Sequence, residues 1–90
     1  MNKHPINKLI SLLRQTKGLS LSLLSNKTNI PKTTLANLEK CIRKPHPQTL
    51  YKLSKFYNIN FILLIKDEEK IEELIQQIES TSYDVSNHIF

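Results

Sequence analysis

The chain has 90 residues, of which 39% are hydrophobic, and its formal net charge is +5. This length supports one domain with a modest core, and the single cysteine, Cys41, excludes an internal disulfide and therefore a disulfide-stapled secreted domain. The longest apolar run, residues 61–65, is too short to cross a membrane, and polar residues interrupt any signal-peptide core near the start, so we expect a cytoplasmic protein without membrane association.

Five short helices are predicted over residues 5–65, because apolar side chains recur there at helical spacing. The first helix ends near Gly18, a natural C-terminal stop. The second begins at Ser20, whose hydroxyl suits an N-cap, and ends at Asn29, which tolerates a left-handed backbone. A third helix starts at Pro31.

A predicted loop over residues 41–47 separates the third and fourth helices, because its prolines cannot continue a helix. Pro47 suits the first position of the fourth helix, and Asn58 ends it. Asn60 is expected to cap a short fifth helix over residues 61–65.

A separate amphipathic helix is predicted over residues 67–80, with acidic residues crowding its first turn. Its apolar positions follow the i, i+3, i+4, i+7 spacing and are Ile71, Leu74, Ile75 and Ile78. Residues 81–90 are predicted to form a polar tail. The chain is therefore predicted to be all-α, with a body over residues 1–66, an added acidic helix and a tail.

The charge is unevenly divided between these parts. Residues 1–66 hold 12 basic residues and one acid, Glu39, for a net charge of +11, whereas residues 67–90 carry −6. A compact unit with so much positive charge repels itself unless a polyanion neutralises it, which favours a nucleic-acid partner. A well-solvated basic surface and an anionic membrane surface are the alternatives, but the basic residues do not gather opposite one bulky apolar face, as membrane binding requires.

Catalytic and metal-binding patterns are absent from the sequence. His4, His46 and His88 lie far apart without carboxylate or thiol neighbours at ligand spacing, and His46 is expected to cap the fourth helix. The basic neighbours of Cys41 would make its thiol more acidic, but no general base accompanies it. One glycine cannot build a phosphate-binding loop. We therefore expect no enzymatic activity, no cofactor and no metal.

The third predicted helix divides its residues between two roles. Leu35 and Leu38 would anchor it to the core, whereas short polar or cationic side chains lie on its other faces. These outward side chains suit a recognition helix in a DNA major groove, since Asn pairs with adenine, Lys reaches guanine or phosphate, and Thr contacts bases. An ordinary amphipathic helix with a solvated face shows the same pattern.

The order of residues over positions 6–65 resembles the phage-repressor/Cro (XRE-like) family of helix-turn-helix transcription regulators. The resemblance rests on a connected series: Arg14, Lys17, Gly18, Leu19, Ser20, Leu24, Ser25, Asn29, Ile30, Thr34, Leu35, Leu38, Glu39, Pro45, Thr49, Leu50, Leu53, Asn58 and Ile59. It implies a lambda-repressor-like five-helix domain that binds double-stranded DNA, is most often a repressor, and acts as a homodimer with two recognition helices about one DNA turn apart.

The resemblance also implies roles for individual residues. An ion pair between Arg14 and Glu39 would join the first and third helices. The residues implied to contact base edges are Lys32, Thr33, Thr34 and Asn37. Those implied to contact phosphates are Ser20, Lys40, Arg43 and Lys44. Several positions depart from the family pattern, namely Leu21 for a glutamine, Leu23 for an exposed polar residue, Thr28 for a core residue and Cys41 for a glycine.

The last departure is an excess of apolar residues at the C-terminal end, where Ile62 and Leu63 replace polar family residues. Such a surface needs a partner. We predict a dimer or partner interface formed by Phe61, Ile62, Leu63, Ile71, Leu74, Ile75 and Ile78. Two alternatives stay open: the added helix folds back and covers this surface within one chain, or the surface binds another protein, such as the toxin partner of an antitoxin.

Overall fold

The computed structural model of the protein describes residues 4–40 and 45–89, and the side chains of residues 4–40 and 45–80. All regular elements of this part of the chain are α-helices, which confirms the predicted all-α fold class. The helices are α1 (Pro5–Thr16), α2 (Leu21–Thr28), α3 (Lys32–Glu39), α4 (Pro47–Tyr57), α5 (Phe61–Leu64) and α6 (Glu68–Ile89).

Side-chain caps begin five of these six helices, including α6, where Asp67 Oδ1 accepts the Lys70 amide at 3.1 Å. Ser20 Oγ accepts the Leu23 amide of α2 at 3.0 Å, and Asn60 and His46 cap α5 and α4 as predicted. His4 Nδ1 caps α1 by accepting the Ile6 amide at 3.1 Å, which the sequence analysis did not anticipate. Each cap satisfies an amide that the first turn of a helix leaves without a partner.

Left-handed residues end the helices where the sequence predicted stops. Asn29 after α2 has a φ of 59°, and Asn58 after α4 has a φ of 58°. Gly18, between α1 and α2, has a φ of 66°. Asparagine and glycine adopt this conformation at little energetic cost, so these three positions turn the chain sharply between successive helices.

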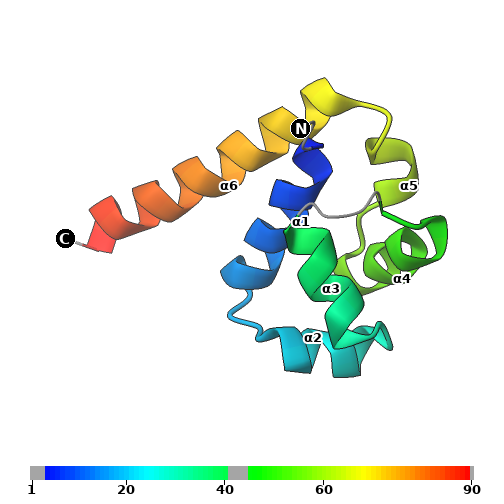
Figure 1. Ribbon diagram of the computed structural model, residues 1–90. Helices are drawn as coiled ribbons and strands as arrows, with labels where there is room; N and C mark the ends of the chain where they lie inside the picture. Colours follow the sequence, from blue (N-terminus) through cyan, green and yellow to red (C-terminus); the bar gives the residue numbers. More distant parts are fainter. Residues whose placement is uncertain (1–3, 41–44, 90) are drawn as a thin grey trace.

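One hydrophobic core joins all six helices of the described chain. The helix α1 contacts α6 and α3, α2 contacts α3 and α4, and α5 contacts α4 and α6 (Figure 1). The largest fully buried side chains are Phe61, Ile6, Leu9, Ile10, Leu24, Ile30, Leu35, Leu53 and Ile71. Burying such side chains from water is the main favourable term in the folding of a domain this small.

The added helix α6 folds back across α1, which is the alternative that the sequence left open. Ile71 is 0% exposed and Ile75 is 3% exposed, and Phe61 of α5 is also fully buried. These three predicted interface residues therefore belong to the core of the chain in this structure. Leu74 and Ile78 are half-buried against the same core.

An ion pair and a histidine–carboxylate contact at the surface accompany this packing. Lys8 Nζ lies 3.5 Å from Glu79 Oε2, and His4 Nε2 lies 3.7 Å from Glu68 Oε2. All four side chains are partly exposed, so each pair adds little stability compared with the buried isoleucines.

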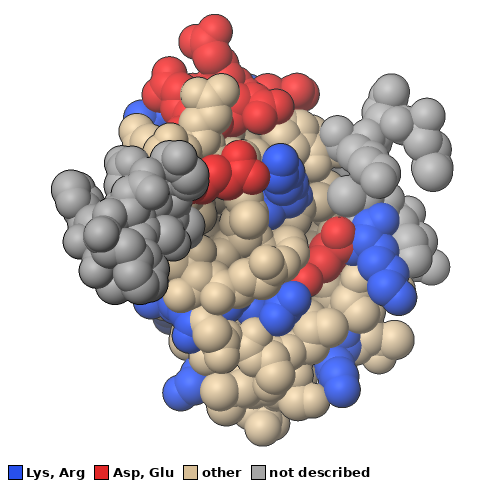
Figure 2. All heavy atoms as spheres, turned by 90° about the vertical axis from the view of Figure 1, so that its left-hand side faces the viewer, with Lys and Arg blue, Asp and Glu red and all other residues tan. Residues whose placement is uncertain are grey.

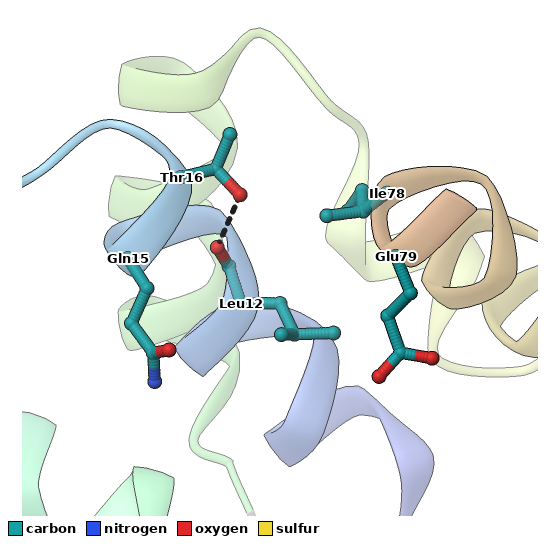
Figure 3. Close-up of a pocket in the computed structure, with 5 residues that line it drawn as sticks. All are labelled: Leu12, Gln15, Thr16, Ile78 and Glu79. Carbon is teal, nitrogen blue, oxygen red and sulfur yellow. Dashed lines mark hydrogen bonds between the residues drawn. The ribbon is translucent and has the colours of Figure 1, made fainter. Parts of the chain in front are cut away.

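The helix α6 is longer than predicted and continues to Ile89, through residues expected to form a tail. It diverges from the end of α1 and extends beyond the body (Figure 1). Where the two helices separate, Leu12 and Ile78 face a hollow of about 370 Å³ that Gln15, Thr16 and Glu79 also line (Figure 3). Within the described residues, no helix is both long and apolar enough to span a membrane.

Candidate nucleic-acid interface

The helix α3 presents its apolar residues to the core and its polar residues to solvent. Leu35 is 0% exposed and Leu38 is 4% exposed. The predicted base-contacting residues Lys32, Thr33 and Thr34 are exposed at its N-terminal end, and Asn37 is half-buried one turn later. Lys32, Thr33 and Thr34 are therefore open to a partner, whereas Asn37 is only partly accessible.

The turn before α3 is held by side chains from two other helices. Ser25 of α2 donates its hydroxyl hydrogen to the Ile30 carbonyl at 2.5 Å, and Ile30 is 2% exposed beneath the turn. From α4, the ammonium of Lys52 donates to the Asn29 carbonyl at 3.0 Å. Sequence reasoning identified Ser25, Asn29 and Ile30 but missed Lys52, because a lysine on an amphipathic helix resembles any solvated charge.

The first turn of α3 follows Pro31, and no side-chain cap is present there among the described residues. The amides at the start of a helix carry partial positive charge and have no acceptor within the helix. Lys32 adds a full positive charge at the same end. This end of α3 therefore suits hydrogen-bond acceptors and negative charge.

The other end of α3 is attached to α1 through an ion pair. Arg14 Nε donates to Glu39 Oε2 at 2.7 Å, and Arg14 Nη2 donates to Glu39 Oε1 at 3.0 Å. The two side chains are only 18% and 11% exposed. Arg14 Nη1 also donates to the Leu19 carbonyl at 2.7 Å, so one guanidinium links α1, the loop before α2 and α3. The hydrogen bonds to Glu39 raise the pKa of Arg14 above its ordinary value.

A second attachment, which sequence reasoning missed, comes from Asn7 of α1. Its Nδ2 donates to the Leu38 carbonyl at 2.6 Å, and the residue is 3% exposed. A signal was available: Asn7 stands between Ile6 and Ile10 on the apolar stripe of α1, where a polar side chain needs a buried partner.

Tyr57 of α4 is buried close enough to this ion pair to be influenced by its charges. Its ring makes edge-to-face contacts with Phe56 and Phe61, at centroid distances of 4.9 and 6.2 Å. The hydroxyl has no hydrogen-bond partner among the described residues. Burial, together with the charge of Glu39, raises the pKa of Tyr57 to about 12.

Two of the four predicted phosphate contacts lie within the described residues. Ser20 and Lys40 are both exposed, at the start of α2 and the end of α3. Arg43 and Lys44 lie outside the described residues, as does Cys41. Leu21 is half-buried against the core, whereas Leu23 is 42% exposed.

The two signs of charge are separated on the surface. Figure 2 shows acidic side chains gathered at the end where α6 begins, with Lys and Arg spread over the remainder of the same face. The exposed acids there are Asp67, Glu68, Glu69, Glu72 and Glu73. A polyanion is therefore repelled from the start of α6 and attracted elsewhere. Among the described residues, no group of three histidine, cysteine or acidic side chains could hold a metal ion.

Comparison with known proteins agrees with this geometry. A family model described as helix-turn-helix matches residues 10–64, which is more than half of the chain and covers α2 and α3 completely. No curated protein and no solved structure matches the chain. The matched family binds DNA and regulates genes. The chain therefore belongs to the XRE-like family of helix-turn-helix DNA-binding regulators.

Proposed function

We propose that the protein is a repressor that binds a specific operator as a homodimer, with α3 of each copy in a major groove. The observation that carries this proposal is the exposed polar face of α3 on a helix attached at both ends. Lys52 and Ser25 bind the carbonyls before α3, and Arg14 binds Glu39 at its end. A fixed helix can present base-reading groups in one orientation, which sequence discrimination requires.

Each predicted contact has a chemical role in this proposal. Lys32 donates to guanine or to a phosphate, Thr33 and Thr34 bond a base or touch a thymine methyl, and Asn37 pairs with the adenine edge. Ser20 and Lys40 bind phosphates, and Arg43 and Lys44 are proposed for the same role from the sequence alone. Phosphate contacts set the register on the duplex, and base contacts set the sequence preference.

Dimerisation is proposed through the exposed apolar residues of α5. Leu63 is 66% exposed and Ile62 is 39% exposed, so two adjacent apolar side chains of α5 lie at the surface of the single chain. Ile62 also lines a hollow of about 570 Å³ with Tyr51 and Ile59. A two-fold contact between two copies would bury this surface and pair two recognition helices.

The proposed function is tested by selecting duplexes from a random pool with the intact protein. We expect one pseudo-palindromic sequence to be enriched, with binding that weakens steeply as salt rises. Sedimentation of the complex should give two protein copies per site, and DNA upstream of the gene that encodes the protein should contain the sequence. Enrichment of no sequence, even at low salt, would contradict the proposal.

A second candidate is an antitoxin-type module that binds another protein. The exposed Leu63 and Leu23 would give it apolar anchors for a partner protein. A stable one-to-one complex with a different protein encoded by a neighbouring gene, together with loss of that complex in Leu63→Asp, would support this candidate. Self-association of the purified protein through the same residue favours the homodimer instead.

A further inference from the structure

We propose that Asn7 is a positioning residue for base recognition, which acts on α3 from the neighbouring helix α1. This inference rests on the proposed function. Asn7 is 3% exposed, and its Nδ2 donates to the Leu38 carbonyl at 2.6 Å. It lies outside residues 10–64, which the family model matches, so the family match assigns no role to it.

The Leu38 carbonyl lies in the last turn of α3, where carbonyls have few helical amides to accept. The amide of Lys40, the residue after α3, is shared between the Ala36 and Leu38 carbonyls. From α1, Asn7 supplies the Leu38 carbonyl with a buried side-chain donor. The bond therefore favours one distance between α1 and the end of α3.

This contact acts on the backbone, whereas the neighbouring ion pair acts on a flexible side chain. Asn7 and Arg14 lie two turns apart on α1, so they face the same way and hold adjacent residues of α3. A Glu39 side chain can change rotamer while the helix shifts, but the Leu38 carbonyl cannot. Asn7 therefore constrains the position of the helix end more directly than Arg14 does.

The consequence falls on Asn37, the residue before Leu38. The start of α3 has separate attachments, because Ser25 and Lys52 bind the carbonyls of the preceding turn. Loss of the Asn7 bond should therefore tilt α3 about its N-terminal end. This tilt displaces Asn37 from the base that it reads, while Lys32 keeps its contact.

The test uses the duplex that the intact wild-type protein enriches from a random pool, together with its single-base variants. Asn7→Leu has a similar volume and cannot donate. We expect roughly tenfold less discrimination at the base pair whose preference Asn37→Ala also relaxes. Asn7→Leu should keep the base preference at the position that Lys32 reads, which is the position relaxed in Lys32→Ala. The slope of log Kd against log salt should also stay the same, because no phosphate contact is lost.

Ser54→Ala is the matched control, measured at a temperature where all variants are folded. The Ser54 hydroxyl donates to the Leu50 carbonyl at 2.7 Å and accepts the Phe61 amide at 3.0 Å, without touching α3. This control should leave all base preferences unchanged. Three results would overturn the inference. They are an equal loss of base discrimination in Asn7→Leu and Ser54→Ala, a loss spread evenly over all base pairs, and no loss in Asn7→Leu. If the wild type enriches no duplex, the proposed function fails as well.

Asn7→Asp provides a second measurement if Asn7→Leu does not fold. Its carboxylate has nearly the same shape but cannot donate, whereas the protonated acid offers an O–H to the Leu38 carbonyl. Burial raises the pKa of such a carboxyl, so protonation occurs under mildly acidic conditions. At each pH, the base discrimination of Asn7→Asp is compared with that of the wild type. This ratio should recover as the pH falls, and absence of recovery would overturn the inference.

Discussion

The Arg14 guanidinium and the Glu39 carboxylate meet side by side, with donor–acceptor distances of 2.7 and 3.0 Å. The two residues are 25 positions apart in sequence, so the pair fixes α3 against α1 across the whole helix-turn-helix unit. Glu39 is the one acid among residues 1–66, and its contact with Arg14 joins α3 to α1.

Removal of this ion pair should lower stability strongly. Arg14→Met keeps the apolar stem but removes the guanidinium, and we expect the free energy of unfolding to fall by about 3 kcal/mol. Urea unfolding followed by circular dichroism measures the change. The double variant Arg14→Met with Glu39→Gln should recover part of the loss, because the carboxylate is then no longer present. Glu39→Gln alone lowers the free energy of unfolding by some amount. If adding Glu39→Gln to Arg14→Met lowers it by that same amount, the two side chains do not interact.

Residues on the face of α3 should separate into two classes. Lys32→Ala and Asn37→Ala should each relax the preference at one base position, at a cost of about 1–3 kcal/mol in operator binding. Lys40→Ala should weaken binding to all duplexes alike and reduce the salt slope by about one. Gel shifts with the operator and its single-base variants at several salt concentrations distinguish these results. A uniform loss in Asn37→Ala would make Asn37 a phosphate contact.

Local features of the fold could be predicted from the sequence, because they depend on neighbouring residues. Ser20, Asn29 and Asn58 act at helix ends through their own backbone and side-chain preferences, and they do so in the structure as expected. The surface that the apolar face with Ile71 and Ile75 packs against could not be predicted. Such a helix face packs equally well on its own chain or on a partner.

The candidate site shows the same division between local and long-range information. The exposed residues of α3 follow from its periodicity, whereas the contacts of Asn7 and Lys52 depend on which carbonyls tertiary packing brings near them. Nothing about Lys52 in the sequence indicates its partner on the turn before α3. For Asn7, the one indication was its place between Ile6 and Ile10 on the apolar stripe of α1.

The apolar surface of α5 should control self-association without affecting the fold. Because Leu63 is 66% exposed, Leu63→Asp should change the unfolding free energy by no more than about 0.5 kcal/mol. The same change places a charge on both sides of a two-fold contact, so the dimer Kd should rise at least tenfold. Analytical ultracentrifugation measures this constant. Gln76→Asp adds the same charge on the exposed face of α6 and should leave the Kd unchanged.

The packing of α6 on α1 should contribute to the stability of the domain. Ile71→Ala removes a fully buried side chain, and we expect a loss of about 2–5 kcal/mol with one cooperative unfolding transition. The neighbouring exposed Glu72 supplies the control, because Glu72→Ala should lie within about 0.5 kcal/mol of wild type. A negligible effect of Ile71→Ala would mean that α6 is not packed on the body in solution.

Stability at alkaline pH should depend on Tyr57. Its pKa is raised to about 12 by burial, against an ordinary value of 10.0 in the unfolded chain. As the pH rises, the unfolded chain therefore loses the Tyr57 proton before the folded chain does. The stability that Tyr57 contributes is fully present below pH 10 and is lost as the pH rises towards 12. A difference of this size corresponds to about 2–3 kcal/mol.

Tyr57→Phe removes both this titration and a hydroxyl that has no partner among the described residues. Near neutral pH the variant should be at least as stable as wild type, by up to about 1 kcal/mol, because no buried polar atom is left unsatisfied. Above about pH 10, the stability advantage of Tyr57→Phe should grow by the amount of unfolding free energy that the wild type loses through Tyr57. Tyr51→Phe, at a side chain 54% exposed, should follow the wild-type pH dependence. Unfolding free energies of Tyr57→Phe and wild type that stay parallel up to pH 12 would place the Tyr57 hydroxyl in contact with water.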